Sequence, residues 1–266
     1  MPQADADADL RSPYDPSQER RSGVSEVQRL RGPGDEESRA PSVSSGSSVP
    51  LVQAFTGGVA AENSWLVIDA SGREAVIIDP GAAAPQLLAA LRQSGAVPRA
   101  IVLTHAHFDH VEGIRDVRAV FPDLEIWLHP ADRRLYDAVP QQGLWFGLEL
   151  DALPDPDRDL EPGQPLIFGS LEFEVRFTPG HAPGHVTLVL PEAGLALVGD
   201  VIFQGSVGRT DLPGGDARTL MDSIQREILT LPDSTRLLPG HGPETTVGAE
   251  RATNPYVRAA LHESQP

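Results

Sequence analysis

Most of the chain consists of short apolar segments separated by glycine, proline and polar residues. SWLVID (residues 64–69) and EAVIID (74–79) are apolar runs of strand length joined by a short turn sequence, which predicts a β-hairpin. LEFEVRFT (171–178) alternates apolar and polar residues with a period of two, as expected for a strand with one buried face. VTLVL (186–190) and LALVG (195–199) are predicted to form a further strand pair.

Helical signals lie between these strands. PQLLAALRQSG (85–95) begins with proline, ends with glycine and places its leucines on one face, which predicts a helix. The pattern also predicts helices over residues 111–120 and 217–231, and in the latter apolar residues recur every four positions. Because strands are followed by helices in both halves of the sequence, we expect a mixed α/β domain built of layers.

Residues 1–49 have a different composition. They contain a single aromatic residue, Tyr14, many charges, and a serine-rich end, SVSSGSS (42–48). Such a segment cannot bury enough apolar surface to offset the loss of chain entropy. We therefore predict a disordered tail over residues 1–49 and a single domain over residues 50–266.

The composition restricts the partners and the compartment of the protein. Its formal net charge of −17 argues against nucleic acid and anionic membranes as partners, because both attract clusters of Lys and Arg. The acidic N-terminus lacks the apolar stretch of a signal peptide, and no segment reaches the ~18 apolar residues that suggest a membrane span. We expect a soluble, cytoplasmic protein without a membrane partner, as a monomer or small homo-oligomer.

Polar residues of the kinds that bind metals follow the predicted strands. These residues are Asp79, the heptapeptide THAHFDH (104–110), His181, Asp200 and His241. Where strand ends gather at one edge of a sheet, such residues can converge on a single cleft. The chain has no cysteine, so a metal bound there must be held by nitrogen and oxygen ligands.

The heptapeptide carries the strongest chemical signal. His105 and His107 are two residues apart, so both imidazoles can face one point on an extended loop, and His181 can add a third nitrogen. Three imidazoles and a carboxylate within seven residues have no explanation in packing alone, because burying them without partners is costly. His129 and His262 lie outside this pattern and are interpreted as ordinary surface or core residues.

A second point of convergence follows from the same motif. Asp109 and His110 can face a point near the first, His241 can complete it, and Asp200 is placed to bridge the two. Imidazole and carboxylate ligands without thiolate suit zinc, iron or manganese. Three protein ligands per ion leave a position open for water, which is typical of a catalytic rather than a structural site.

These motifs resemble the metallo-β-lactamase superfamily, whose signature is His-x-His-x-Asp-His. The resemblance extends over residues 51–256. Four further blocks resemble the short bacterial glyoxalase II-like hydrolases, which cleave S-acyl glutathione thioesters. The blocks are TPGHAPGH (178–185), VGDVIF (198–203), GSVGRTDLPGGD (205–216) and PGHGPETTVGAERATNPYV (239–257). The family implies an α/β fold, a four-layer αβ/βα sandwich with metals at the sheet edge.

The resemblance also implies the site and the reaction. Two divalent metals are expected, zinc in the first place, with iron or manganese as alternatives. The implied ligands are His105, His107 and His181 for one metal, Asp109, His110 and His241 for the other, and Asp200 between them. A hydroxide bridging the metals would attack the thioester carbonyl, with Asp109 and Asp200 as catalytic residues. Arg209, at the position of a family lysine, is expected to bind the anionic small-molecule substrate.

The sequence departs from full-length glyoxalase II in three places. That protein carries a C-terminal helical domain that supplies much of the glutathione pocket, whereas this sequence ends shortly after NPYV (254–257). A tyrosine of the family is lost near Arg209, and Ala182 replaces the usual threonine after the third histidine. We therefore expect a more open pocket with weaker dependence on the glutathione portion of the substrate.

An alternative reaction comes from the same superfamily. Persulfide dioxygenases share the seven-residue pattern and a GRTD segment (208–211) but use a single iron. In that group a cysteine often stands at the position of His185, and the block at 239–257 favours the hydrolases. We therefore favour a metal-dependent thioester hydrolase and retain the iron-dependent persulfide dioxygenase as the alternative. A binding protein with a vestigial site would have lost at least one ligand, and none is lost.

Overall fold

The computed structural model of the chain describes residues 49–263. The predicted tail over residues 1–49 therefore lies outside the described residues, except for residue 49. Among the described residues, two six-stranded sheets and one two-stranded sheet carry the fold.

The first large sheet has the strand order β1-β2-β3-β4-β5-β6. Its strands are β1 (Leu51–Gly57), β2 (Glu62–Ile68), β3 (Glu74–Ile78), β4 (Val97–Val102), β5 (Ile126–Leu128) and β6 (Arg158–Asp159). The first three strands pair antiparallel and the remaining pairs are parallel. The helices of this half are α1 (Ala84–Ser94), α2 (Phe108–Val111), α3 (Ile114–Val120), η2 (Pro130–Asp132), α4 (Arg133–Asp137) and α5 (Val139–Trp145).

The second large sheet has the order β14-β13-β10-β9-β8-β7. Its strands are β7 (Pro165–Phe168), β8 (Leu171–Phe177), β9 (Val186–Leu190), β10 (Leu195–Gly199), β13 (Arg236–Pro239) and β14 (Thr245–Thr246). Among the described strand pairs of this sheet, β10–β13 is parallel and the others are antiparallel. The remaining elements are η3 (Pro191–Ala193), the hairpin β11 (Ile202–Phe203) and β12 (Ser206–Val207), α6 (Ala217–Ser223), η4 (Ile224–Ile228), α7 (Val247–Thr253) and α8 (Pro255–Glu263).

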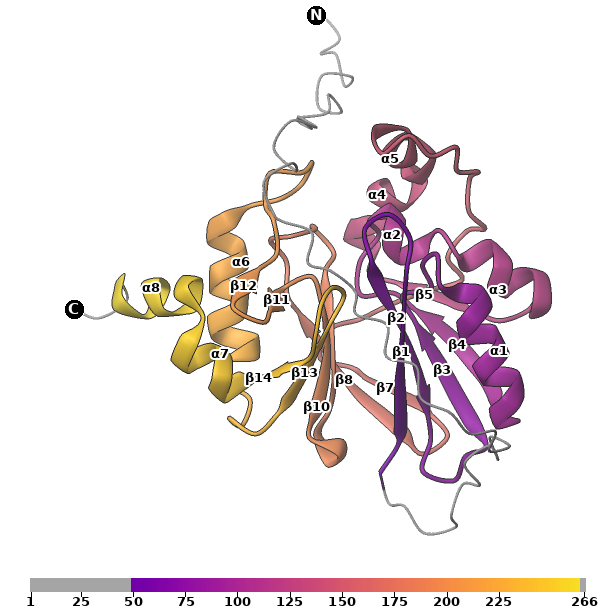
Figure 1. Cartoon of the computed structure of the whole chain (residues 1–266), viewed down its shortest axis with the longest axis horizontal. Helices are drawn as coiled ribbons and strands as arrows, with labels where there is room; N and C mark the ends of the chain where they lie inside the picture. Colours follow the sequence, from indigo (N-terminus) through magenta and orange to yellow (C-terminus); the bar gives the residue numbers. More distant parts are fainter. Residues whose placement is uncertain (1–48, 264–266) are drawn as a thin grey trace, which may run out of the picture.

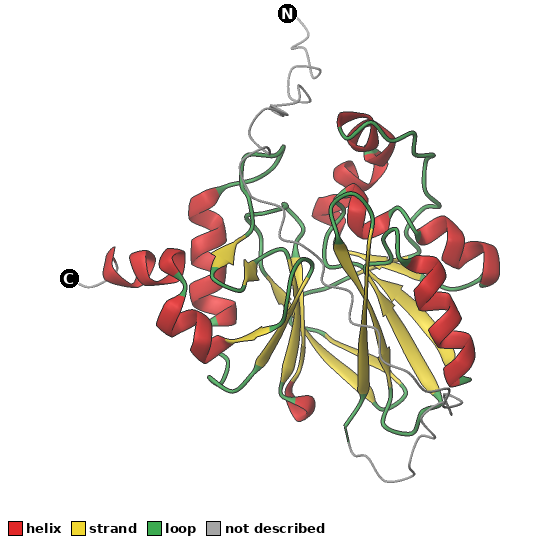
Figure 2. Cartoon of the chain, in the orientation of Figure 1, coloured by secondary structure: helices red, strands yellow, loops and turns green. Residues whose placement is uncertain are grey.

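The elements form four layers, with the two sheets inside and helices on both outer faces (Figures 1 and 2). Alternate residues of each strand point to opposite faces, so Trp65 and Val67 pack between the sheets while Leu66 packs under the outer helices. The inner cluster joins Phe173 of β8 to residues of the first sheet. These layers confirm the predicted four-layer αβ/βα sandwich.

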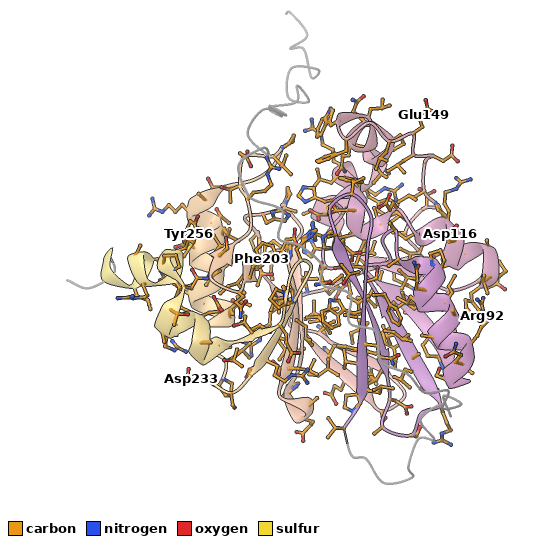
Figure 3. The ribbon with its side chains drawn as sticks, viewed as in Figure 1. Arg92, Asp116, Glu149, Phe203, Asp233 and Tyr256 are labelled. Atoms are coloured by element: carbon orange, nitrogen blue, oxygen red, sulfur yellow. The ribbon has the colours of Figure 1, made fainter. Side chains whose placement is uncertain are left out.

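Side chains fill the space between the sheets, whereas charged residues such as Arg92, Asp116 and Asp233 lie on the outer surfaces (Figure 3). Burial of the apolar side chains at about 25 cal/mol per Å² is the main stabilising term for such a core. Over the described part of the chain, no helix has both the length and the apolar character that a membrane crossing requires.

The structure confirms the predicted hairpin, the helix at 85–95 and the strand pair formed by β9 and β10. It corrects the helix predicted over 111–120, which is broken into α2 and α3 at Gly113. The N–H of Gly113 donates to the carbonyl oxygen of Pro80, and a Cβ at this position would lie 2.2 Å from the carbonyl oxygen of Gly81. Residues 217–231 begin as α6 but continue as the π-helix η4.

The inner core offers a test of this packing. Phe173 is 0% exposed between the sheets, so Phe173→Ala should lower the free energy of unfolding by about 3–5 kcal/mol through lost burial and the cavity left behind. Ile167 on the neighbouring β7 is 59% exposed, and Ile167→Ala should change it by less than about 0.5 kcal/mol. Urea unfolding of both variants measures the difference, and equal losses would contradict the assigned layers.

Candidate metal centre

The predicted ligands lie together at one edge of the two sheets. His105, His107, Asp109 and His110 follow β4, His181 lies between β8 and β9, Asp200 follows β10, and His241 follows β13. The parallel pair β10–β13 directs two of these chain segments toward the same edge. The structure thus brings all seven predicted residues into one site, formed by both halves of the sandwich.

The first ligand group consists of three histidines. One ligand nitrogen each of His105, His107 and His181 lies within 4.8 Å of the other two. His107 Nδ1 is 2.8 Å from His181 Nε2, and all three residues are buried. Three neutral imidazoles around one point can hold a divalent metal and leave a further position open.

The second group combines a carboxylate with two histidines. The ligand atoms of Asp109, His110 and His241 also lie within 4.8 Å of one another. His241 Nε2 is 3.3 Å from Asp109 Oδ2, and His110 Nε2 is 4.0 Å from the same oxygen.

Asp200 lies between the two groups. Its Oδ2 is 3.4 Å from Nε2 of His181 and 3.4 Å from Nε2 of His241. Its Oδ1 is 3.4 Å from Nε2 of His110. A carboxylate in contact with both groups is the arrangement that the sequence predicted for a bridging ligand.

The unpartnered atoms at this edge fit metal ions. His105 Nε2 is buried and has no hydrogen-bond partner, although an unsatisfied buried polar atom costs about 1–3 kcal/mol, and His110 Nε2 and Asp200 Oδ1 have only the longer ion-pair contacts given above. They face one region and offer only nitrogen and oxygen, the donor set expected of a chain without cysteine. The residues present therefore fit a pair of divalent metals.

The opposite nitrogens of the histidine rings are held by the protein. His110 Nδ1 is 3.1 Å from Asp79 Oδ2, His181 Nδ1 is 2.8 Å from the carbonyl oxygen of Arg209, and His241 Nδ1 is 3.0 Å from that of Ala60. A ring whose Nδ1–H is held by the protein directs Nε2 at the site as the atom that can bind a metal, so these contacts fix the ring orientation.

Asp79 holds the start of the heptapeptide and orients a histidine. Its backbone lies in the left-handed region with φ 47°, and its carboxylate accepts the N–H of Thr104 at 2.7 Å and the hydroxyl of Thr104 at 2.6 Å. The same carboxylate contacts His110, and Thr104 Oγ1 is 3.1 Å from His105 Nδ1. One buried aspartate therefore positions the start of the heptapeptide, His110 directly and His105 through Thr104.

His185 lies behind the ligands. Its Nε2 accepts the N–H of Asp200 at 3.1 Å, its Nδ1 is 2.9 Å from Thr178 Oγ1, and its ring stacks on His105 with centroids 5.0 Å apart. It is fully buried and supports the backbone of Asp200 rather than facing the ligand groups.

The pKa values of the histidines differ between the two ligand groups. Burial, reinforced by the neighbouring His181, lowers the pKa of His107 to about 3, so this ring is neutral. Burial also lowers the pKa of His241, but Asp109 and Asp200 outweigh it and raise this pKa to about 10. Burial opposes ionisation of Asp200, yet His110 holds the pKa of this carboxyl well below its usual range. Two ionised carboxylates in a buried site give a charge distribution that divalent cations balance.

Sequence reasoning missed Asp132, which fixes two ligand loops at once. Its buried carboxylate accepts the N–H of Ala106, between His105 and His107, at 3.0 Å and also the N–H of Gly184. Burial raises the pKa of Asp132 to about 6. The only sequence signal was an aspartate after the short strand β5.

The block at 239–257 supports the wall of the site from behind. Glu250 is buried and accepts the N–H of Gly205 at 2.9 Å, and the Asn254 amide donates to the carbonyl oxygen of Ser206 at 2.9 Å. Both contacts hold the hairpin β11–β12, whose Phe203 ring lies 6.0 Å from the ring of His241.

Arg209 lines the site and pairs with a neighbour. Its guanidinium makes a bidentate contact with Asp211, at 2.7 and 2.9 Å, and the side chain is 45% exposed. The guanidinium therefore forms a salt bridge at the surface of the site. The carbonyl oxygen of Arg209 also holds His181, a role that the sequence did not indicate.

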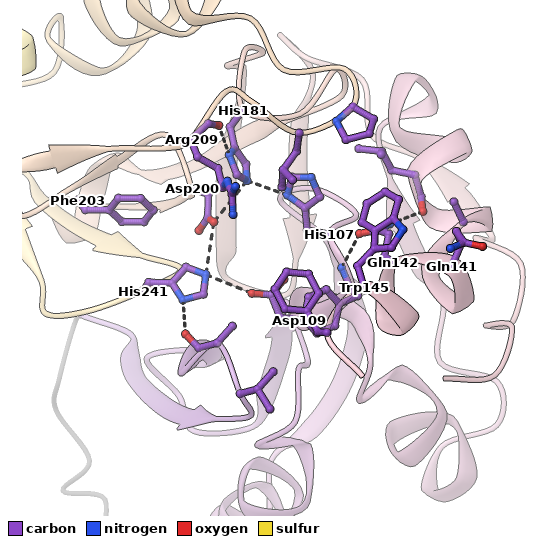
Figure 4. Close-up of a pocket in the computed structure, with 18 of the residues that line it drawn as sticks. His107, Asp109, Gln141, Gln142, Trp145, His181, Asp200, Phe203, Arg209 and His241 are labelled. Atoms are coloured by element: carbon purple, nitrogen blue, oxygen red, sulfur yellow. Dashed lines mark hydrogen bonds and ion pairs between the residues drawn. The ribbon is translucent and has the colours of Figure 1, made fainter. Parts of the chain in front are cut away.

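An open cavity of about 590 Å³ leads to the ligands (Figure 4). His107, Asp109, His181, Asp200 and His241 form part of its lining, together with residues of α4, α5 and the hairpin β11–β12. A cavity of this size holds a small organic molecule and brings it to the point where the two ligand groups meet.

Comparisons with known proteins agree with this geometry. A sequence model of the metallo-beta-lactamase superfamily matches residues 57–241, which include all seven predicted ligands. The probable metallo-hydrolase YqgX of Bacillus subtilis is 41% identical, and the alignment covers 73% of this chain and 92% of that protein. The hydroxyacylglutathione hydrolase GloC of Haemophilus influenzae is 38% identical, covering 74% of this chain and 93% of that protein.

Among solved structures, TTHA1623 in a di-iron-bound form is 44% identical and matches with a TM-score of 0.71, covering 77% of this chain and 99% of that chain. The similarity therefore extends over both sheets and the edge that carries the ligands. The chain belongs to the metallo-β-lactamase superfamily.

Proposed function

We propose that this protein is a hydrolase that uses two divalent metals to cleave thioesters of the S-lactoyl or S-acyl glutathione type, and that residues 50–266 form its hydrolase domain. The observation that carries the proposal is Asp200, shared between two ligand groups at an open cavity, in a chain 38% identical to a hydroxyacylglutathione hydrolase. The superfamily supports metal-dependent hydrolysis in general, and the GloC relative supports the thioester as substrate.

The residues of the chain have distinct tasks in this reaction. His105, His107 and His181 would hold one metal, and Asp109, His110 and His241 the other, with Asp200 in contact with both. When bound, such metals lower the pKa of a coordinated water toward 7 and polarise the carbonyl of the substrate. The chain has no cysteine to act as a nucleophile, so a water molecule is the nucleophile we infer.

The identity of the metals follows from the donor set only in part. Imidazole and carboxylate suit zinc, iron and manganese alike, and a di-iron form of TTHA1623 exists. We infer a zinc pair or a mixed zinc and iron pair. Elemental analysis of the purified protein tests this directly, and a protein that holds no transition metal would contradict the whole proposal.

A substrate panel tests the reaction class. S-lactoylglutathione should be hydrolysed, with release of free thiol, whereas glutathione persulfide should cause no oxygen consumption and a β-lactam should remain intact. Thiol release and an oxygen electrode give the two readouts. Stoichiometric oxygen uptake without thioester cleavage would instead assign the protein to the persulfide dioxygenases.

Variants of Asp109 and His185 distinguish a residue that binds metal from one that only supports the metal ligands. Asp109→Ala should empty or weaken one metal position and lower kcat by several orders of magnitude, because the second ligand group loses its carboxylate. His185→Ala should cost far less, since His185 belongs to neither ligand group: it accepts the N–H of Asp200, contacts the Thr178 hydroxyl and stacks on the ring of His105. Metal content and kcat of both variants provide the measurement, and similar losses from both would mean that the ligands are wrongly assigned.

Arg209 is proposed to bind the anionic part of the substrate. It is the residue with a permanent positive charge among those lining the cavity, and its side chain is partly exposed there. Arg209→Ala should raise KM for S-lactoylglutathione about tenfold, with a much smaller change for a neutral thioester, because a charge-assisted contact is worth about 1.5–3 kcal/mol. Asp211→Asn is the matched control, since it keeps the guanidinium but removes its present partner. An equal loss on both substrates would indicate a structural role.

A further inference from the structure

The two walls of the cavity differ in charge: the segment 203–213 carries Arg209 beside the apolar residues Phe203, Val207, Leu212 and Pro213, whereas α5 contributes no charged residue to the lining. Arg209 lies on the side of the cavity near His181 and Asp200, and Trp145 of α5 lies on the opposite side, near His107 and Gln142 (Figure 4). The lining of the α5 side is mainly apolar and consists of Phe108, Leu135, Ala138, Trp145 and Phe146, with the amides of Gln141 and Gln142. A substrate with one charged end and one apolar end would match this division.

The apolar wall is held in place beside the metal ligands. The buried side chain of Gln142 accepts the N–H of Phe108 at 3.1 Å and donates to the carbonyl oxygens of Ala106 and Leu135 at 3.2 and 2.7 Å. The rings of Phe108 and Phe146 pack with centroids 4.6 Å apart. One amide therefore ties α4 and α5 to the loop that carries His105 and His107, so the wall exists before any substrate arrives.

Trp145 is not explained by core packing. It is only partly buried and lines the cavity, whereas the preceding residue of the same helix, Leu144, is 58% exposed and does not line it. Across the mouth, Val59 at the turn between β1 and β2 is 65% exposed and also lines the cavity. Apolar side chains left open to water on both sides of a cavity are typical of a surface that an apolar ligand group covers.

We propose that the acyl group of the substrate lies against Trp145 and Phe146, and that the enzyme prefers thioesters with apolar acyl chains to those with small polar ones. This inference rests on the proposed thioesterase function. The orientation follows from the charges, because the carboxylates of a glutathione carrier belong beside Arg209, which leaves the acyl side of the thioester facing α5.

The length of the substrate's acyl chain is the property that tests this proposal. Each methylene group that enters an apolar wall gains about 0.8 kcal/mol, which corresponds to a rise in affinity of about fourfold. For thioesters of one carrier, glutathione, kcat/KM should therefore rise steeply from S-acetyl through S-butyryl to S-hexanoyl, whereas S-lactoyl should fall near S-acetyl. Trp145→Ala should lower the ratio of S-hexanoyl to S-acetyl kcat/KM by about tenfold. Leu144→Ala, one residue away on the same helix, should leave this ratio unchanged.

Binding without chemistry separates this inference from the proposed reaction. S-methylglutathione and S-hexylglutathione are thioethers that lack the thioester carbonyl, so calorimetry reports their Kd independently of hydrolysis. The hexyl compound should bind the metal-loaded protein at least tenfold more tightly than the methyl compound, and Trp145→Ala should abolish the difference. Metal content and the unfolding midpoint of the variant should match those of the unsubstituted protein.

Failure of the apolar wall and failure of the proposed thioesterase function give different results in these experiments. If the chain-length preference is present in binding and lost in Trp145→Ala, the apolar wall is supported even where no thioester is cleaved, and only the proposed function fails. If thioesters are cleaved but kcat/KM is independent of acyl length, the apolar wall is wrong and the function stands. Equal losses on all substrates in Trp145→Ala, or the same loss in Leu144→Ala, would also overturn the inference.

Discussion

The carboxylate of Asp200 lies 3.4 Å from a nitrogen of each of three histidines, and this contact constrains much of the surrounding chain. Histidines from the short helix α2, a loop and a strand end can surround one carboxylate only where the backbone leaves room. A Cβ on Gly240 would lie 2.3 Å from Asp200 Oδ1, and a Cβ on Gly208 would lie 1.9 Å from the carbonyl oxygen of Asp200. The glycines beside the ligands are therefore steric requirements of the site.

The groups behind the ligands hold loops that have no regular structure of their own. Asp79 accepts the N–H of Thr104, and Asp132 accepts the N–H groups of Ala106 and Gly184. Each carboxylate is buried, and each satisfies backbone donors that a loop would otherwise leave without partners. Because the loops are fixed before a metal binds, less ordering entropy opposes binding, and the spacing of the ligand atoms is set by the sandwich rather than by the ion.

The local patterns were predictable, and the long-range contacts were not. The heptapeptide indicated four ligands because they lie within seven residues, and strand periodicity placed the others at the same edge. Asp132 and Gln142 gave no such signal, since they act on backbone groups 26 and 34 residues away. The break at Gly113 was equally hidden, because it depends on the approach of Pro80 and Gly81 from another loop. Contacts of this kind arise from the packing of the layers and leave no periodicity in a single sequence.

Two kinds of contact thus meet at the cavity. The metal edge is determined by hydrogen bonds to backbone and ring nitrogens, in which a change of one atom alters the geometry of a ligand. The wall formed by α4 and α5 contacts that edge through the Gln142 amide and through apolar packing of Phe108 on Phe146. Trp145 lines the cavity, and among the described residues its side chain makes no hydrogen bond to a ligand loop, so it can change in size while the ligand loops keep their backbone partners. The fold therefore separates the residues that would perform hydrolysis from those that would select the acyl group. Because of this separation, the preference for acyl-chain length and the metal content can be measured independently of each other.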